Sequence, residues 1–120
     1  MIQLDYKSGI SICEQIVNGI VKLKALGVMK SGEKLPSVRA LASKLAVNPN
    51  TVQKAYLLLE ERKIICTVKG KGSFISDDET VNGAIKAEAT ENFAKAVKAA
   101  LSLGLTKEEL IKTVKGESDI

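Results

Sequence analysis

The sequence of 120 residues contains no histidine and no tryptophan, and it has only two cysteines, two phenylalanines and two tyrosines. Without histidine, neither a Ser-His nor a Cys-His catalytic pair can form, and a zinc site of the usual kind lacks ligands. The scarcity of aromatic rings leaves little surface on which unpaired bases could stack, which argues against binding to single-stranded nucleic acid. We therefore expect no catalytic residues, no bound metal and no cofactor.

The two cysteines, Cys13 and Cys66, lie far apart and are flanked by apolar residues. This arrangement favours reduced, partly buried thiols over a disulfide framework, and hence a reducing compartment. The first residues lack the apolar core of a signal peptide, and no stretch approaches the roughly 18 apolar residues that a membrane span needs. The composition thus indicates a soluble, cytoplasmic protein with no membrane partner.

Hydrophobic residues make up 45% of the chain, which is enough to bury an aliphatic core in one domain, or in one small domain with an appendage. Charge is unevenly distributed: residues 1–76 carry 12 Lys and Arg against 5 Asp and Glu, whereas residues 77–120 carry 6 against 9. A basic first segment suits a phosphate-rich partner, and a mildly acidic tail suits a protein partner. The composition changes at the acidic stretch 77–80, so we predict two modules, residues 1–76 and residues 77–120.

Helical patterns dominate the first module. Ile12, Ile16 and Ile20 repeat at the spacing of an amphipathic helix, which we expect to run to about residue 27. A connector containing glycine and proline follows. Ser37 then stands at the N-cap position of a second helix over residues 38–45.

A third helix is predicted to begin at Asn48 and Pro49, because asparagine caps helices well and proline is tolerated at the first helical position. Its buried face is formed by apolar residues at helical spacing, namely Val52, Ala55, Tyr56 and Leu59. Two β-prone runs, Ile64–Val68 and Ser73–Ile75, follow the helix and are separated by the basic turn Lys69–Gly72. The sequence therefore predicts a hairpin with a basic tip.

The second module is predicted to contain two helices. Alanine-rich sequence from residue 81 to 103 favours a long helix, and Thr106 with Glu109 matches a capping box that opens a final one. Two helices bury little by themselves, so their apolar side must pack either on the first module or on a second chain. We expect a homodimer with these candidate interface residues: Ile85, Phe93, Val97, Leu101, Leu110 and Ile111.

The polar side chains of the first module fit the chemistry of duplex DNA. Asparagine and glutamine amides can pair with adenine, threonine can touch a base or a thymine methyl group, and lysine and arginine meet phosphate or guanine. The candidate DNA-binding residues come from the second helix, the start of the third helix and the hairpin turn: Ser37, Arg39, Asn48, Asn50, Thr51, Gln53, Lys54, Lys69, Gly70 and Lys71.

Each of these features also has a plainer interpretation, as a helix cap, a solvated surface or an ordinary turn. An enzyme is a weak alternative, since Gly70–Ser73 lacks the spacing of a phosphate-binding loop and lies in a hairpin. A winged-helix module that docks only on proteins remains the main alternative.

Four stretches of the sequence resemble the GntR family of bacterial transcriptional regulators, and in particular its short YtrA-like branch. They are Ile12–Ile16, Gly32–Arg39, Val47–Val52 and Gly70–Phe74. The resemblance implies a mainly α fold with a small β-hairpin, a winged helix-turn-helix followed by a two-helix C-terminal dimerisation element. It further implies that the third helix enters the major groove and that the hairpin is a wing in the minor groove.

The resemblance also implies roles for individual residues. Arg39 matches the arginine that contacts DNA from the second helix, and Gly70 beside Lys69 matches the wing tip. Polar contact positions at the start of the third helix are matched by Asn48, Asn50 and Thr51, while Gln53 falls where some relatives have a base-reading arginine.

Three residues depart from the family pattern. Pro49 stands where some relatives have another arginine, so the preferred operator should differ from theirs. Ser11 and Cys13 replace an expected proline and tyrosine, which affects local packing.

The resemblance implies a repressor, often of transporter operons, that binds an inverted-repeat double-stranded DNA operator as a homodimer; no effector is identified.

Overall fold

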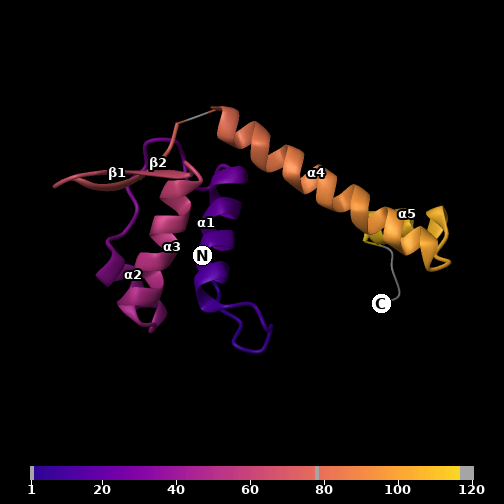
Figure 1. Ribbon diagram of the computed structural model, residues 1–120, viewed down its shortest axis with the longest axis horizontal. Helices are drawn as coiled ribbons and strands as arrows, with labels where there is room; N and C mark the ends of the chain where they lie inside the picture. The colour runs from indigo at the N-terminus through magenta and orange to yellow at the C-terminus, as the bar shows by residue number, and fades with distance from the viewer. Residues whose placement is uncertain (1, 78, 117–120) are drawn as a thin grey trace. The chain divides into compact units, whose positions relative to one another are not determined.

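The computed structural model describes residues 2–77 and 79–116 (Figure 1). Within them the chain forms five helices and a two-stranded antiparallel hairpin, in the order α1, α2, α3, β1, β2, α4, α5. The expected mainly α fold with a small hairpin is confirmed. The chain divides into two compact units, residues 1–82 and 83–120.

Helices α1 (Ile12–Ala25), α2 (Val38–Leu45) and α3 (Pro49–Glu61) begin where side chains can satisfy unpaired backbone N–H groups. The caps are Ser11, Ser37 and Asn48. The sequence placed the caps of α2 and α3 correctly, together with proline at the start of α3.

Helix α1 ends at Ala25, two residues before the predicted end. Leu26 closes the last turn, and Gly27 then adopts a left-handed conformation with φ of 74°, which glycine reaches without steric cost. The helix therefore stops before glycine instead of including it.

The core of the first unit lies where α1, α3 and the hairpin meet. Its largest fully buried side chains are Ile16, Ile20, Val52, Leu59, Ile65 and Ile75. The predicted buried face of α3 is confirmed, since none of its four residues is more than 5% exposed. Packing of aliphatic side chains from all three elements thus fixes the orientation of α3.

Between α2 and α3 the chain reverses at Ala46, which has φ of 56° and ψ of 46°. The Ala46 N–H donates to carbonyl groups of the last turn of α2, and Val47 donates to the Ala42 carbonyl at 3.0 Å. A residue with a Cβ is strained in this conformation, so the turn is held by its hydrogen bonds and its neighbours.

Strands β1 (Ile65–Val68) and β2 (Gly72–Ile75) pair from Ile65 opposite Ile75 to Val68 opposite Gly72. The segment before α2, which the sequence presents as a connector, is hydrogen-bonded along the other edge of β2. Leu35 N–H donates to the Ser73 carbonyl, and Ile75 N–H donates to the Glu33 carbonyl, each at 2.8 Å. The wing is therefore a small sheet fastened to the entry of α2.

The expectation of partly buried thiols holds for Cys13 but is wrong for Cys66. Both cysteines are free, and Cys13 is half-buried. Cys66 lies on β1, where only the first residue is buried and the following three are exposed.

The second unit contains most of α4 (Glu79–Ser102) and all of α5 (Lys107–Lys115). The capping box at the start of α5 is confirmed: Thr106 Oγ1 accepts from the Glu109 N–H, and the Glu109 carboxylate accepts from the Thr106 N–H. No side chain of residues 83–116 is buried. The division after residue 76 stays a prediction.

Candidate nucleic-acid interface

Nine of the ten candidate DNA-binding residues are exposed, and Thr51 is half-buried. Those on α2 and α3 lie on two helices that pack against each other, whereas Lys69, Gly70 and Lys71 lie in the hairpin turn. The hairpin extends from the C-terminal end of α3 on the side of α2, away from α1 (Figure 1). The structure thus offers two contact regions. One is formed by α2 and the start of α3, and the other is the wing tip.

Two candidates also have a structural task. Ser37 Oγ accepts from the Ala40 N–H at 3.1 Å, and Asn48 Oδ1 accepts from the Asn50 N–H at 2.8 Å. The Asn48 oxygen is therefore committed to capping α3, whereas its amide nitrogen can still donate to a partner. The capping interpretation is confirmed and does not exclude DNA contact.

Tyr56 links the two helices in a way that the sequence did not reveal. Its hydroxyl group donates to the Pro36 carbonyl oxygen at 2.6 Å, and its side chain is 5% exposed. Burial raises the pKa of Tyr56 to about 12, so the hydroxyl remains a donor at neutral pH. This bond ties α3 to the residue immediately before the cap of α2 and so orients the two contact helices together.

The basic side chains of the first unit are not neutralised internally. Within the described part of the chain, the one ion pair joins Lys95 to Glu91 on α4, at 3.5 Å. Among residues 2–77, therefore, neither Arg39 nor any lysine has a carboxylate within ion-pair distance. Such positive groups attract phosphate, and phosphate neutralisation releases counterions.

The backbone of the wing turn can approach a partner closely. Lys71 N–H donates to the Val68 carbonyl at 2.9 Å, and Gly70 adopts φ of 79°. Lys69 and Lys71 consequently flank a residue without a side chain, and the backbone can lie against a phosphate or a groove. Behind the turn, Thr67 and Ser73 hydroxyl groups lie 3.0 Å apart across the strands.

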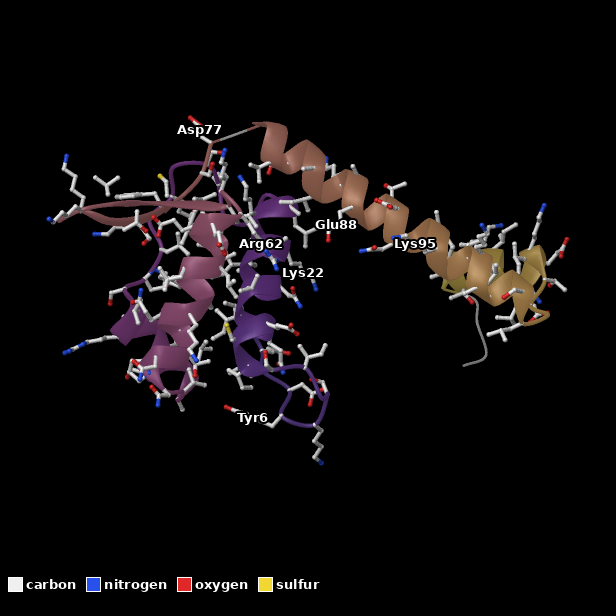
Figure 2. The ribbon with its side chains drawn as sticks, in the orientation of Figure 1. Tyr6, Lys22, Arg62, Asp77, Glu88 and Lys95 are labelled. Atoms are coloured by element: carbon white, nitrogen blue, oxygen red, sulfur yellow. The ribbon has the colours of Figure 1, made fainter. Side chains whose placement is uncertain are left out.

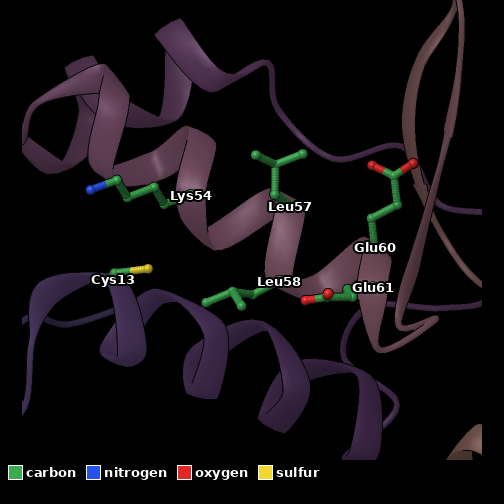
Figure 3. Close-up of a pocket in the computed structure, with 6 residues that line it drawn as sticks. All are labelled: Cys13, Lys54, Leu57, Leu58, Glu60 and Glu61. Carbon is green, nitrogen blue, oxygen red and sulfur yellow. The ribbon is translucent and has the colours of Figure 1, made fainter.

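Lys54 lies apart from the wing, beside an open hollow of about 680 Å³ between α1 and α3 (Figure 3). Cys13 lies opposite it on α1, and Leu57 and Leu58 contribute apolar surface. Sequence spacing placed Lys54 on the exposed side of α3 but gave no indication of this hollow.

The sequence pattern of the gntR family, described as bacterial regulatory proteins, matches residues 12–75. The chain belongs to this family. It is 50% identical over 78 residues to the HTH-type transcriptional repressor YtrA of Bacillus subtilis, an alignment that covers 65% of this chain and 60% of the relative. The protein is thus a transcription regulator of the GntR family with a winged helix-turn-helix fold.

Two solved structures from Listeria monocytogenes resemble the GntR protein over nearly its full length. One, described as a transcriptional antiterminator, has a TM-score of 0.80 and 39% identity, and covers 97% of this chain and 88% of its own. The other, a GntR family transcriptional regulator, has a TM-score of 0.75 and 40% identity, and covers 92% of this chain and 98% of its own. None of the helices in the described part of the chain combines the length and the apolar composition that a membrane span requires.

Proposed function

We propose that the protein is a DNA-binding transcriptional repressor that recognises an inverted-repeat operator as a homodimer. In this proposal, the start of α3 enters the major groove and the wing contacts the adjacent minor groove. The observation that carries the proposal is the set of exposed polar and basic residues on α2 and α3, which have no ion-pair partners among residues 2–77. The names of the GntR relatives support the same assignment.

The side chains at the start of α3 suit adenine and phosphate. Asn50 and Gln53 are exposed and can pair with a base edge, while the uncapped part of the helix N-terminus and the Asn48 amide favour phosphate. Arg39 adds a charged donor from α2. Because Pro49 offers no donor, the operator should depend more on amide contacts than on arginine–guanine pairs.

The homodimer is supported by the second unit. Phe93 is 56% exposed, Leu101 38% and Ile111 51%, and the other candidate interface residues (Ile85, Val97 and Leu110) are half-buried. Phe93 and Leu101, which the sequence assigns to the interface, are exposed in a single chain, and a second copy would cover them. Two recognition helices related by a twofold axis would meet half-sites roughly 34 Å apart.

The operator can be identified by selecting bound sequences from a random duplex pool with the full chain. We expect an inverted repeat, and a selected duplex that is bound more weakly as salt increases. RNA of the selected sequence serves as a competitor, because one similar structure is described as an antiterminator. A chain that binds no duplex at any salt concentration would favour the protein-docking alternative.

Variants then test the contact residues. Arg39→Ala and Asn50→Ala should each weaken operator binding by roughly 1 to 3 kcal/mol while the thermal unfolding transition is kept. Asn18→Ala is a matched control, since Asn18 is exposed on α1. If both interface variants bind like the wild type, the proposed contact surface on α2 and α3 is refuted.

The dimer is tested separately by sedimentation. Leu101→Asp combined with Ile111→Asp places carboxylates at two exposed apolar positions of the second unit, so we expect monomers and much weaker operator binding. A double variant that remains dimeric would place the interface elsewhere.

A further inference from the structure

Lys34 occupies an unusual place at the edge of the wing. It lies between Glu33 and Leu35, whose backbone groups hydrogen-bond to β2, and it forms an antiparallel bridge with Phe74. Its backbone is thus part of the wing sheet, although the sequence pattern predicts only a connector there. A residue held in this way keeps a fixed position relative to the wing turn.

The Lys34 side chain lies across Gly72. A Cβ atom added to Gly72 would lie 2.9 Å from Lys34 Cε and 3.7 Å from Nζ. Gly72 also has φ of 116°, a conformation that residues with side chains rarely adopt. The absence of a side chain at residue 72 therefore provides the space along which the lysine stem runs.

This contact directs the Lys34 ammonium group to the end of the hairpin. Gly72 forms the last strand pair before the turn, opposite Val68, and the turn itself carries Lys69 and Lys71. Packing of the aliphatic stem against backbone restricts the side chain, so less conformational entropy is lost when the amine binds a partner.

No carboxylate neutralises this amine within the described part of the chain. Glu33, the residue before it, accepts from the Lys30 N–H through Oε1 at 3.4 Å, and Glu60 accepts from the Thr67 hydroxyl through Oε2 at 3.4 Å; neither carboxylate forms an ion pair with Lys34. The ammonium group is left available to an anion outside the protein.

We infer that Lys34 is a DNA phosphate-binding residue of the wing, held in position by its contact with Gly72. Together with Lys69 and Lys71 it forms a three-lysine clamp on the backbone of a duplex. The inference rests on the proposed DNA-binding function. The role of Lys34 does not depend on the DNA sequence, because a lysine that contacts phosphate contributes affinity without distinguishing bases.

Salt dependence measures this contact directly. Each phosphate neutralised on B-DNA contributes about 0.9 to the slope of log K against log salt. When salt falls from ~1 M to ~0.1 M, one phosphate contact therefore raises the association constant roughly eightfold. A dimer that loses two such contacts loses about 60-fold of this gain. Operator and random duplex should be affected alike.

The decisive variant is Lys34→Met, which keeps an unbranched stem over Gly72 and removes the charge. We expect unchanged thermal unfolding and a slope reduced by about 1 per protomer on both duplexes. Lys34→Arg, which retains the charge, should restore the wild-type slope. Lys22→Met is the matched control, because Lys22 is exposed on α1 and points away from the hairpin (Figure 2).

The outcomes separate the two hypotheses. If the wild-type chain shows no salt-dependent binding to duplex DNA, the proposed function itself fails. If the wild type binds and Lys34→Met keeps its slope, the phosphate contact is refuted while the function stands. A slope reduced equally by Lys22→Met would show only a general charge effect and would also refute the inference.

Discussion

Substitutions of Asn48 can separate the two tasks that the structure gives this residue. Its side-chain oxygen caps α3 through the 2.8 Å bond from the Asn50 N–H, and the residue is exposed, so its amide nitrogen can donate to a partner. Aspartate and serine keep an oxygen that can cap the helix but remove the amide, whereas alanine removes both. Stability and DNA affinity should therefore follow different orders among the three variants.

The capping bond sets the expected stabilities. Asn48→Ala should lower the free energy of unfolding by about 1 kcal/mol, which corresponds to roughly 4–8 °C in the melting temperature of a domain this small. Asn48→Ser should be close to the wild type. Asn48→Asp should equal or exceed it, because a negative charge at a helix N-terminus adds ~0.3–1 kcal/mol.

Operator affinity should rank the variants differently. Serine and alanine lose the amide contact, worth on the order of 1 kcal/mol. Aspartate also places a carboxylate near phosphate, a repulsion of about 0.7 kcal/mol at ~6 Å even in bulk water and more at an interface. The most stable variant should thus bind DNA most weakly.

Urea unfolding followed by helical circular dichroism measures stability, and fluorescence anisotropy with a labelled operator measures affinity. Wild-type affinity in the aspartate variant would refute a DNA contact at Asn48 and leave it as a cap alone. Equal destabilisation by aspartate and alanine would refute the capping argument instead.

Two further substitutions test the supports of the interface. Ala46→Gly should raise the free energy of unfolding by roughly 0.5–1 kcal/mol, because glycine relieves the left-handed strain at some entropic cost. The matched Ala40→Gly, inside α2, should lower it by about 1 kcal/mol; urea unfolding in which Ala46→Gly also destabilises would contradict the strain. Tyr56→Phe removes the bond to the Pro36 carbonyl and should cost roughly 1 kcal/mol at neutral pH. Burial raises the Tyr56 pKa from 10.0 to about 12, so the folded protein retains this proton longer than the unfolded chain, and stability from Tyr56 is lost as pH rises from 10 to 12. Melting curves should show the wild-type advantage over Tyr56→Phe shrinking across that range, and a constant advantage would refute the assignment.

Local patterns predicted the helices well. The polar residues Ser37 and Asn48 cap α2 and α3, and the apolar spacing of Val52 and Leu59 identifies the buried face of α3. These features depend on neighbours within a few positions, so the sequence displays them directly. The exposed side of α3 follows by elimination, which is why the candidate contact residues could be named from spacing.

Contacts between distant segments were not predictable in this way. Nothing local to Tyr56 indicates a bond to Pro36, twenty positions earlier, and nothing local to Lys34 indicates a stem lying over Gly72. Ala46 is similar, since alanine favours helices and the pattern gives no reason for a left-handed turn there. Tertiary packing imposes the first two arrangements, and hydrogen bonds to the last turn of α2 hold the turn at Ala46.

The lack of ion pairs among residues 2–77 has a consequence for how the protein leaves DNA. Because aliphatic burial and hydrogen bonds hold the first unit together, and salt screens the repulsion among its unpaired positive charges, added salt should not destabilise it. The same salt should weaken phosphate binding steeply. A rise in cellular ionic strength would therefore release an intact, correctly folded regulator that can bind again as soon as the ions are diluted.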